Sequence, residues 1–166
     1  MVSNRISVTI GCLACFLMIV GIALDAYRAT GPAPGRATPP LPVGTSLPEL
    51  HWPKKRPGSR TLVLYTASSC HFCTASMAFY RTVTAMAARG GHIQVVAATW
   101  EEPERNRRYL ESHSVNVEHV FQGEDLGIMQ SATPTLILVG KDDRVLRSWV
   151  GELPQSAERD VERLVQ

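Results

Sequence analysis

The sequence predicts an α/β domain with a central mixed sheet flanked by helices, which follows an apolar N-terminal segment. Apolar strand-like runs alternate with amphipathic helical stretches, and a turn-forming sequence near the C-terminus separates two further strand-like runs. The chain has 166 residues, enough for one ordinary domain. Its net charge of +2 provides no basic footprint, so we expect no nucleic-acid partner.

The globular region is predicted to alternate strands with helices from its beginning. Thr61–Ala67 is almost wholly apolar, as a strand buried on both faces should be. A helical stretch over Cys70–Arg89 ends at a pair of glycines, and His92–Thr99 is a second buried strand. On the helix, spacings of three and four residues predict one buried face made of Cys73, Met77, Tyr80, Val83 and Ala87.

The second half of the domain is predicted to end in a hairpin and a helix. Pro103 suits the first turn of a helix, and the acidic residues Glu101, Glu102 and Glu104 suit the positive end of its dipole. Gly140–Asp143 is a hairpin signal. The elements expected after the second strand are a helix at Glu102–Ser112, a strand at Val115–Phe121, a short helix at Glu124–Gln130, strands at Thr135–Val139 and Val145–Val150, and a helix at Gln155–Val165.

Residues 6–24 form a run of nineteen residues without a charge. As a helix this run is about 28 Å long, close to the hydrocarbon thickness of a bilayer. We therefore expect residues 1–29 to contain a single uncleaved transmembrane anchor, with the amino terminus inside and the domain outside. A cleaved signal peptide is the alternative, although its apolar core is usually shorter. Cys12 and Cys15 lie within the run and are interpreted as small apolar side chains, with lipid attachment or an intramembrane redox pair less favoured.

Residues 30–59 are predicted to be a Pro-rich linker, because they contain eight of the eleven prolines of the chain. The part at Leu47–Trp52 is apolar enough to pack on the domain that follows. This places the domain at residues 60–166.

A pair of cysteines, Cys70 and Cys73, lies where a buried strand gives way to a helix. At a first helical turn, unpaired N–H groups and the helix dipole stabilise a thiolate and lower the pKa of the first cysteine. The second cysteine, one turn on, faces the domain and can close a disulfide after the first has attacked. A zinc site is disfavoured because the globular region has no other cysteine and its histidines lack paired ligand spacing. We therefore expect redox chemistry, with no metal and no cofactor.

Thr133 and Pro134 immediately precede the expected strand at Thr135–Val139. A proline there can simply mark the start of a strand, since it cannot donate to the ladder. Together with the two-cysteine helix, we favour a cis-proline loop packed beside the disulfide, in which the Thr133 backbone pairs with an extended substrate segment.

In combination, these features resemble the thioredoxin superfamily over residues 60–166. The matching pieces are LVLYTASSCHFC, the TPTLIL strand, the hairpin leading to SWVG, and the closing helix. The additional strand–helix unit before Pro134 is similar to the extracytoplasmic, membrane-anchored TlpA/ResA-like branch. The resemblance implies that Cys70 is the nucleophile, Cys73 the resolving thiol and Pro134 the cis-proline. It also implies a single-pass protein of the bacterial cytoplasmic membrane with its catalytic domain on the periplasmic side.

Three departures from the family pattern concern the redox site. Ser69 replaces a tryptophan of many relatives, Leu64 replaces the buried acid of thioredoxin, and His71-Phe72 fills the interior of the motif. A protonated His71 would stabilise the Cys70 thiolate and make the pair more oxidising. Phe72 is either an apolar contact for clients or a ring packed against the domain.

The expected function is reduction of disulfides in client proteins, with a membrane redox partner that recycles the dithiol. An extracytoplasmic compartment is already oxidising, so a local reductant is the most useful role there. A disulfide oxidase or isomerase is the alternative. A Cu(I) carrier is less favoured, because only His71 is near enough to Cys70 and Cys73 to serve as a further ligand.

Overall fold

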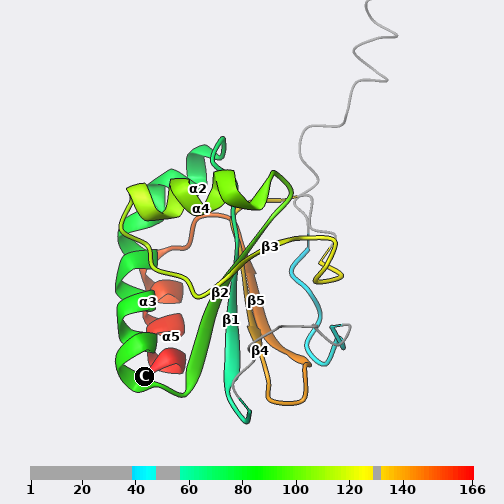
Figure 1. The fold of residues 1–166 in the computed structure, drawn as a ribbon. Coiled ribbons are helices and arrows are strands. Elements are labelled where there is room, and N and C mark those ends of the chain that lie inside the picture. Colours follow the sequence, from blue (N-terminus) through cyan, green and yellow to red (C-terminus); the bar gives the residue numbers. More distant parts are fainter. Residues whose placement is uncertain (1–38, 48–56, 129–131) are drawn as a thin grey trace, which may run out of the picture. The chain divides into compact units, whose positions relative to one another are not determined.

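The computed structural model of the protein describes residues 39–47, 57–128 and 132–166, and Figure 1 draws the remainder as a thin grey trace. The predicted anchor at residues 6–24, including both of its cysteines, lies outside the described residues. Among the helices that are described, none combines the length and apolar character needed to span a bilayer.

A five-stranded mixed sheet forms the centre of the domain, with the strand order β3-β2-β1-β4-β5. The central strand β1 (Arg60–Tyr65) pairs in parallel with β2 (Ile93–Thr99) and antiparallel with β4 (Thr135–Val139). Beyond these, β3 (Val120–Gln122) pairs in parallel with β2, and β5 (Val145–Val150) pairs antiparallel with β4. The mixed sheet predicted from the sequence is confirmed.

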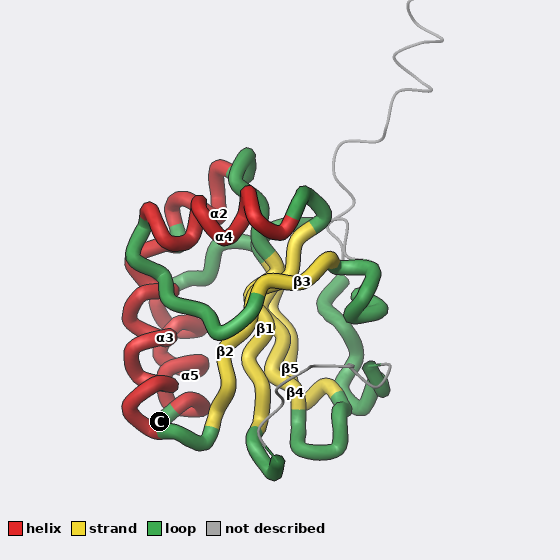
Figure 2. The backbone as a smooth tube through the Cα atoms, in the orientation of Figure 1, coloured by secondary structure: helices red, strands yellow, loops and turns green. Residues whose placement is uncertain are grey.

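The helices of the domain pack on one face of this sheet. They are α2 (His71–Ala75), α3 (Met77–Gly90), α4 (Pro103–Ser112) and α5 (Gln155–Val165). Figure 2 shows α3 and α5 side by side against the sheet, with non-helical segments on its other side. The buried helical face predicted around Tyr80 is confirmed, since all five of its members lie in the core.

Each face of β1 contributes to a separate apolar cluster, because successive side chains of a strand point to opposite sides. Leu62 and Leu64 pack among the helical residues, whereas Val63 and Tyr65 pack with a second cluster on the other face. Among the described residues, that second cluster is closed by side chains from loops, including Leu126 and Leu47. The expectation of a strand buried on both faces is therefore confirmed.

The helix predicted over Cys70–Arg89 is interrupted at Ser76. The Ser76 hydroxyl donates to the Phe72 carbonyl at 2.9 Å, and the Ser76 N–H is shared between the carbonyls of Phe72 and Cys73, each at 3.1 Å. A serine that bonds back to the preceding turn tightens and bends a helix. The two cysteines consequently occupy a short helical segment of their own ahead of α3.

The short helix predicted at Glu124–Gln130 is wrong for the described part, which forms successive turns up to Ile128. Gly127 has φ 60°, a left-handed conformation that interrupts an α-helix, and its N–H reaches the Glu124 carbonyl at 3.0 Å. The strand expected at Val115–Phe121 is also shorter, beginning only at Val120. The Val115 N–H bonds instead to the Leu110 carbonyl at 2.9 Å and closes the end of α4.

Residues 41–47, within the predicted linker, lie antiparallel along the outer side of β5. The Gly44 N–H donates to the Val145 carbonyl at 2.8 Å, and the Val145 N–H donates to the Thr45 carbonyl at 2.9 Å. The Leu47 N–H donates to the Asp143 carbonyl at 3.0 Å, and the Leu47 side chain is only 3% exposed. This segment is therefore part of the folded domain.

Replacing Leu47 with alanine should lower the free energy of unfolding by about 2–4 kcal/mol, because it leaves a cavity in the second apolar cluster. Val43 is the matched control in the same segment, since its side chain is 73% exposed and Val43→Ala should change stability by less than about 0.5 kcal/mol. Urea unfolding of the full chain measures both. Equal, small effects would show that the segment does not contribute to the core.

Candidate active site

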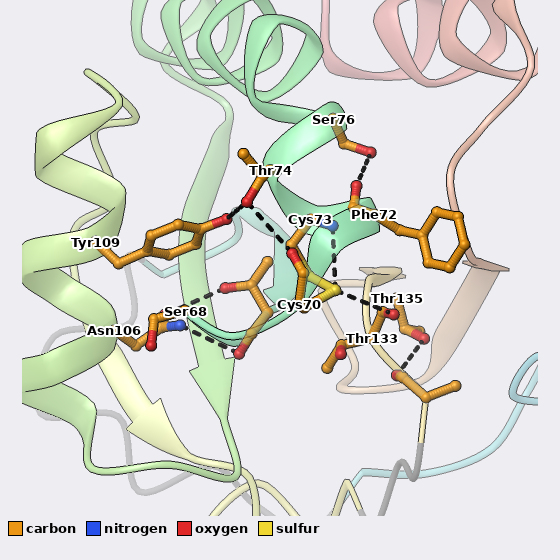
Figure 3. The surroundings of a disulfide bond; sticks show 12 residues. Ser68, Cys70, Phe72, Cys73, Thr74, Ser76, Asn106, Tyr109, Thr133 and Thr135 are labelled. Atoms are coloured by element: carbon orange, nitrogen blue, oxygen red, sulfur yellow. Dashed lines mark hydrogen bonds between the residues drawn. A yellow bond between two sulfur atoms is a disulfide. The ribbon is translucent and has the colours of Figure 1, made fainter.

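A disulfide joins Cys70 and Cys73 just beyond the end of β1, at the start of α2 (Figure 3). Cys70 is the N-cap of the helix, and its sulfur accepts a hydrogen bond from the Cys73 N–H at 3.1 Å. A backbone N–H directed at this sulfur favours its thiolate when the pair is reduced. Cys73 is fully buried, whereas Cys70 is partly exposed. Cys70 is therefore the sulfur that a partner can reach.

Thr133 and Pro134 lie next to this disulfide because β4 runs antiparallel to β1. Tyr65, the last residue of β1, is opposite Thr135, the first of β4, so the residues before β4 meet those after β1. The peptide bond between Thr133 and Pro134 is cis, as the family resemblance predicted. The Thr133 carbonyl oxygen is 3.3 Å from the Cys70 sulfur. The structure thus brings together the two motifs singled out in the sequence.

His71 and Phe72, the interior of the motif, are both exposed on the first turn of α2. Their rings are in edge contact, with centroids 5.7 Å apart. Phe72 is 54% exposed, and Figure 3 shows its ring pointing away from the disulfide. Of the two interpretations of Phe72, the ring packed against the domain is thereby excluded. An apolar side chain is left at the rim of the site.

The position of the buried acid of thioredoxin is apolar in this chain. Leu64 is buried in the same cluster as Cys73. A different carboxylate is buried near the motif: Glu101, just after β2, accepts hydrogen bonds from the Ser68 N–H at 2.7 Å and the Ser68 hydroxyl at 2.9 Å. Ser68 belongs to the loop that leads from β1 into Cys70.

Asn106 of α4 connects Glu101 to the end of β1. Its side-chain amide donates to Glu101 Oε1 and to the Thr66 carbonyl, both at 3.2 Å, and its oxygen accepts from the Thr66 hydroxyl at 3.1 Å. Asn106 is completely buried, and these bonds satisfy its amide. The backbone preceding Cys70 is therefore fastened to α4.

Tyr109, one turn further along α4, contacts the redox helix itself. Its hydroxyl is 2.8 Å from Thr74 Oγ1, and Thr74 in turn donates to the Cys70 carbonyl at 3.3 Å. Burial raises the pKa of Tyr109, the hydrogen bond between Tyr109 and Thr74 lowers it, and the charge of Glu101 raises it further.

Sequence reasoning assigned Glu101 only to the dipole of the following helix and missed its place in the site. The available signal was topological. Glu101 follows β2, and the carboxyl ends of neighbouring parallel strands lie at the same edge of a sheet. No group of three or more His, Cys, Asp or Glu side chains able to hold a metal occurs in the described part of the chain.

Several solved structures share this fold. The thioredoxin domain of a thiol-disulfide oxidoreductase from Bacteroides vulgatus aligns with a TM-score of 0.55 at 15% identity, over 76% of this chain and 99% of that one. StoA from Bacillus subtilis aligns with a TM-score of 0.52 at 11% identity, over 67% of this chain and 85% of that one. A proposed thioredoxin from Neisseria meningitidis aligns with a TM-score of 0.52 at 21% identity, over 65% of this chain and 75% of that one. The domain therefore has the thioredoxin-like fold that residues 60–166 predicted.

At the level of sequence, no protein-family model matches the chain and no curated protein was found to be similar. The thioredoxin-like fold and the Cys70–Cys73 pair at its active end together support a thioredoxin-like oxidoreductase.

Replacing Asn106 with alanine should lower the free energy of unfolding by about 2–4 kcal/mol, because it leaves buried partners at Thr66 and Glu101 unsatisfied. Asn116→Ala is the matched control, since Asn116 is exposed. Chemical denaturation of both variants measures the difference. The proposed connection through Asn106 would be refuted by equal stabilities.

Proposed function

We propose that the protein is a thiol-disulfide oxidoreductase that acts on client proteins through Cys70 and Cys73. The observation that carries the proposal is the asymmetry of the pair, in which a partly exposed sulfur at a helix N-cap is bonded to a fully buried one. An accessible thiolate attacks, and a protected thiol one turn away resolves the product.

In the reductive direction, the Cys70 thiolate attacks one sulfur of a client disulfide. A mixed disulfide forms, and the other client sulfur leaves as a thiolate that takes up a proton. Cys73, after losing its proton, then attacks the Cys70 sulfur, which forms the Cys70–Cys73 disulfide and releases the second client thiol. Two electrons and two protons pass to the client in total. A membrane redox partner must then supply two electrons and two protons to reduce the Cys70–Cys73 disulfide again.

The surroundings of Cys70 suit a polypeptide substrate. The Thr133 carbonyl 3.3 Å from the Cys70 sulfur lies where the backbone of an extended client segment would approach the attacked bond. The exposed Phe72 offers an apolar contact beside it. We assign Thr133, Pro134, Phe72 and His71 to client binding and to support of the dithiol.

Reduction of clients is the direction that we propose, because a compartment outside the cytoplasm already supplies oxidants. Oxidation or isomerisation of clients is the second candidate, favoured by the exposed His71 directly after Cys70. We further propose that residues 6–24 anchor the protein in the bacterial cytoplasmic membrane, with residues 60–166 on the periplasmic side. The uncharged run at residues 6–24 supports this assignment.

A Cys70→Ser variant should lose exchange with a model disulfide, whereas a Cys73→Ser variant should accumulate mixed disulfides with clients because it lacks the resolving thiol. Non-reducing electrophoresis of acid-quenched cells and identification of the trapped proteins measure this. A Cys12→Ser/Cys15→Ser double variant is the control and should exchange normally. Exchange with the model disulfide that persists in Cys70→Ser would contradict the proposal.

If residues 6–24 are an uncleaved anchor, the mature protein should keep its original N-terminus and sediment with membranes. N-terminal peptide analysis of fractionated cells measures both properties. Recovery of a soluble form that begins after residue 26 would establish a cleaved signal peptide instead.

A further inference from the structure

A buried carboxylate, Glu101, is hydrogen-bonded to Ser68 in the loop that leads from β1 into Cys70. The Glu101 side chain is only 6% exposed. Its Oε1 accepts from the Ser68 N–H at 2.7 Å and from Asn106 Nδ2 at 3.2 Å, and its Oε2 accepts from the Ser68 hydroxyl at 2.9 Å. Donors from two different segments converge on it, as an ionised carboxylate requires when it is removed from water.

The cation that pairs with Glu101 is more exposed to solvent than Glu101 itself. Arg105 Nε is 3.6 Å from Glu101 Oε2 and also donates to the Ser68 hydroxyl at 2.9 Å, but the Arg105 side chain is 63% exposed. Water and salt screen an exposed cation more strongly than a buried anion. The exposed Arg105 therefore offsets the charge of the buried carboxylate only in part.

Other titratable groups surround the pair on two elements. His71 is exposed on α2, and Tyr109 of α4 bonds to Thr74 on the redox helix. The charge of Glu101 raises the pKa of Tyr109 in addition to the larger effect of burial.

We propose that Glu101 is a positioning residue that fixes the loop ahead of Cys70 and, through its charge, makes the Cys70–Cys73 pair a stronger reductant. This inference rests on the proposed function. A reduced pair holds negative charge on the Cys70 thiolate, whereas the disulfide is neutral. A fixed anion nearby raises the free energy of the thiolate only, so it shifts the equilibrium towards the disulfide and towards donation of electrons.

The test is equilibration of the full chain with glutathione. The protein disulfide and two glutathione thiols give the protein dithiol and one glutathione disulfide, with transfer of two electrons and two protons. Mass spectrometry of the alkylated peptide that contains Cys70 and Cys73 reports the reduced fraction separately from Cys12 and Cys15.

Glu101→Gln should raise this equilibrium constant about tenfold, equivalent to about 30 mV, and should lower the pH at which Cys70 reacts with iodoacetamide. Arg105→Gln should shift both quantities in the opposite direction, because it removes the cation and leaves the carboxylate. Glu104→Gln is the control, since Glu104 is exposed at the start of α4 and pairs with Arg107.

Opposite shifts of the equilibrium constant in Glu101→Gln and Arg105→Gln would support the inference, since loosening of the loop alone would shift the constant in the same direction in both variants. The inference would be overturned if the equilibrium constant shifted in the same direction in both variants, or if the constant of Glu101→Gln equalled that of Glu104→Gln. If Glu101→Gln does not fold, the sign of the Arg105→Gln shift decides alone, because this exposed side chain lies outside the core. A wild-type chain that does not equilibrate with glutathione at all would refute the proposed function, and the inference with it.

Discussion

Hydrogen bonding of β1 on both edges is the constraint on which the active site depends. Because β2 runs parallel to β1, the loop that contains Glu101 emerges at the same edge as the loop that leads to Cys70. Because β4 runs antiparallel, the residues before it arrive at that edge as well, and Thr133 meets the Cys70 sulfur. Three segments separated by 30 or more residues are thereby assembled at one end of the sheet without any direct sequence proximity.

Hydrogen bonds from α4 and from Glu101, just before it, connect the segments at this end of the sheet. Asn106 bonds to the end of β1, Glu101 bonds to the loop beyond it, and Tyr109 contacts the redox helix through Thr74. A buried polar network is costly unless all of its members are satisfied, and a satisfied network holds its parts in a single arrangement. The position of Cys70 is thus determined by polar contacts on one side and by the packing of Cys73 and Leu64 on the other.

Much of the fold was readable from the sequence because it depends on local patterns. Apolar runs revealed the buried strands, and spacing of three and four residues revealed the core face of α3. The features that escaped prediction depend on contacts between distant segments. The burial of Glu101 requires Ser68 and Asn106 as donors, which become its neighbours only once β1 and β2 have paired.

Two further differences have local causes that the apolar pattern masked. A short helix was predicted at Glu124–Gln130, yet Leu126 and Ile128 enter the core from successive turns around Gly127. The prolines predicted a linker ahead of residue 60. The backbone hydrogen bonds to Asp143 and Val145 are made by Gly44, Thr45 and Leu47, none of which is proline.

That same segment has a consequence for how the domain meets other polypeptides. An uncovered edge strand presents unpaired N–H and C=O groups that can pair with strands from other chains. Residues 41–47 occupy part of that position beside β5. A protein shortened to begin at residue 60, as its proline content would suggest, would expose this edge and invite edge-to-edge self-association. Residues 41–47 thus protect part of the β5 edge of the sheet from pairing with another chain.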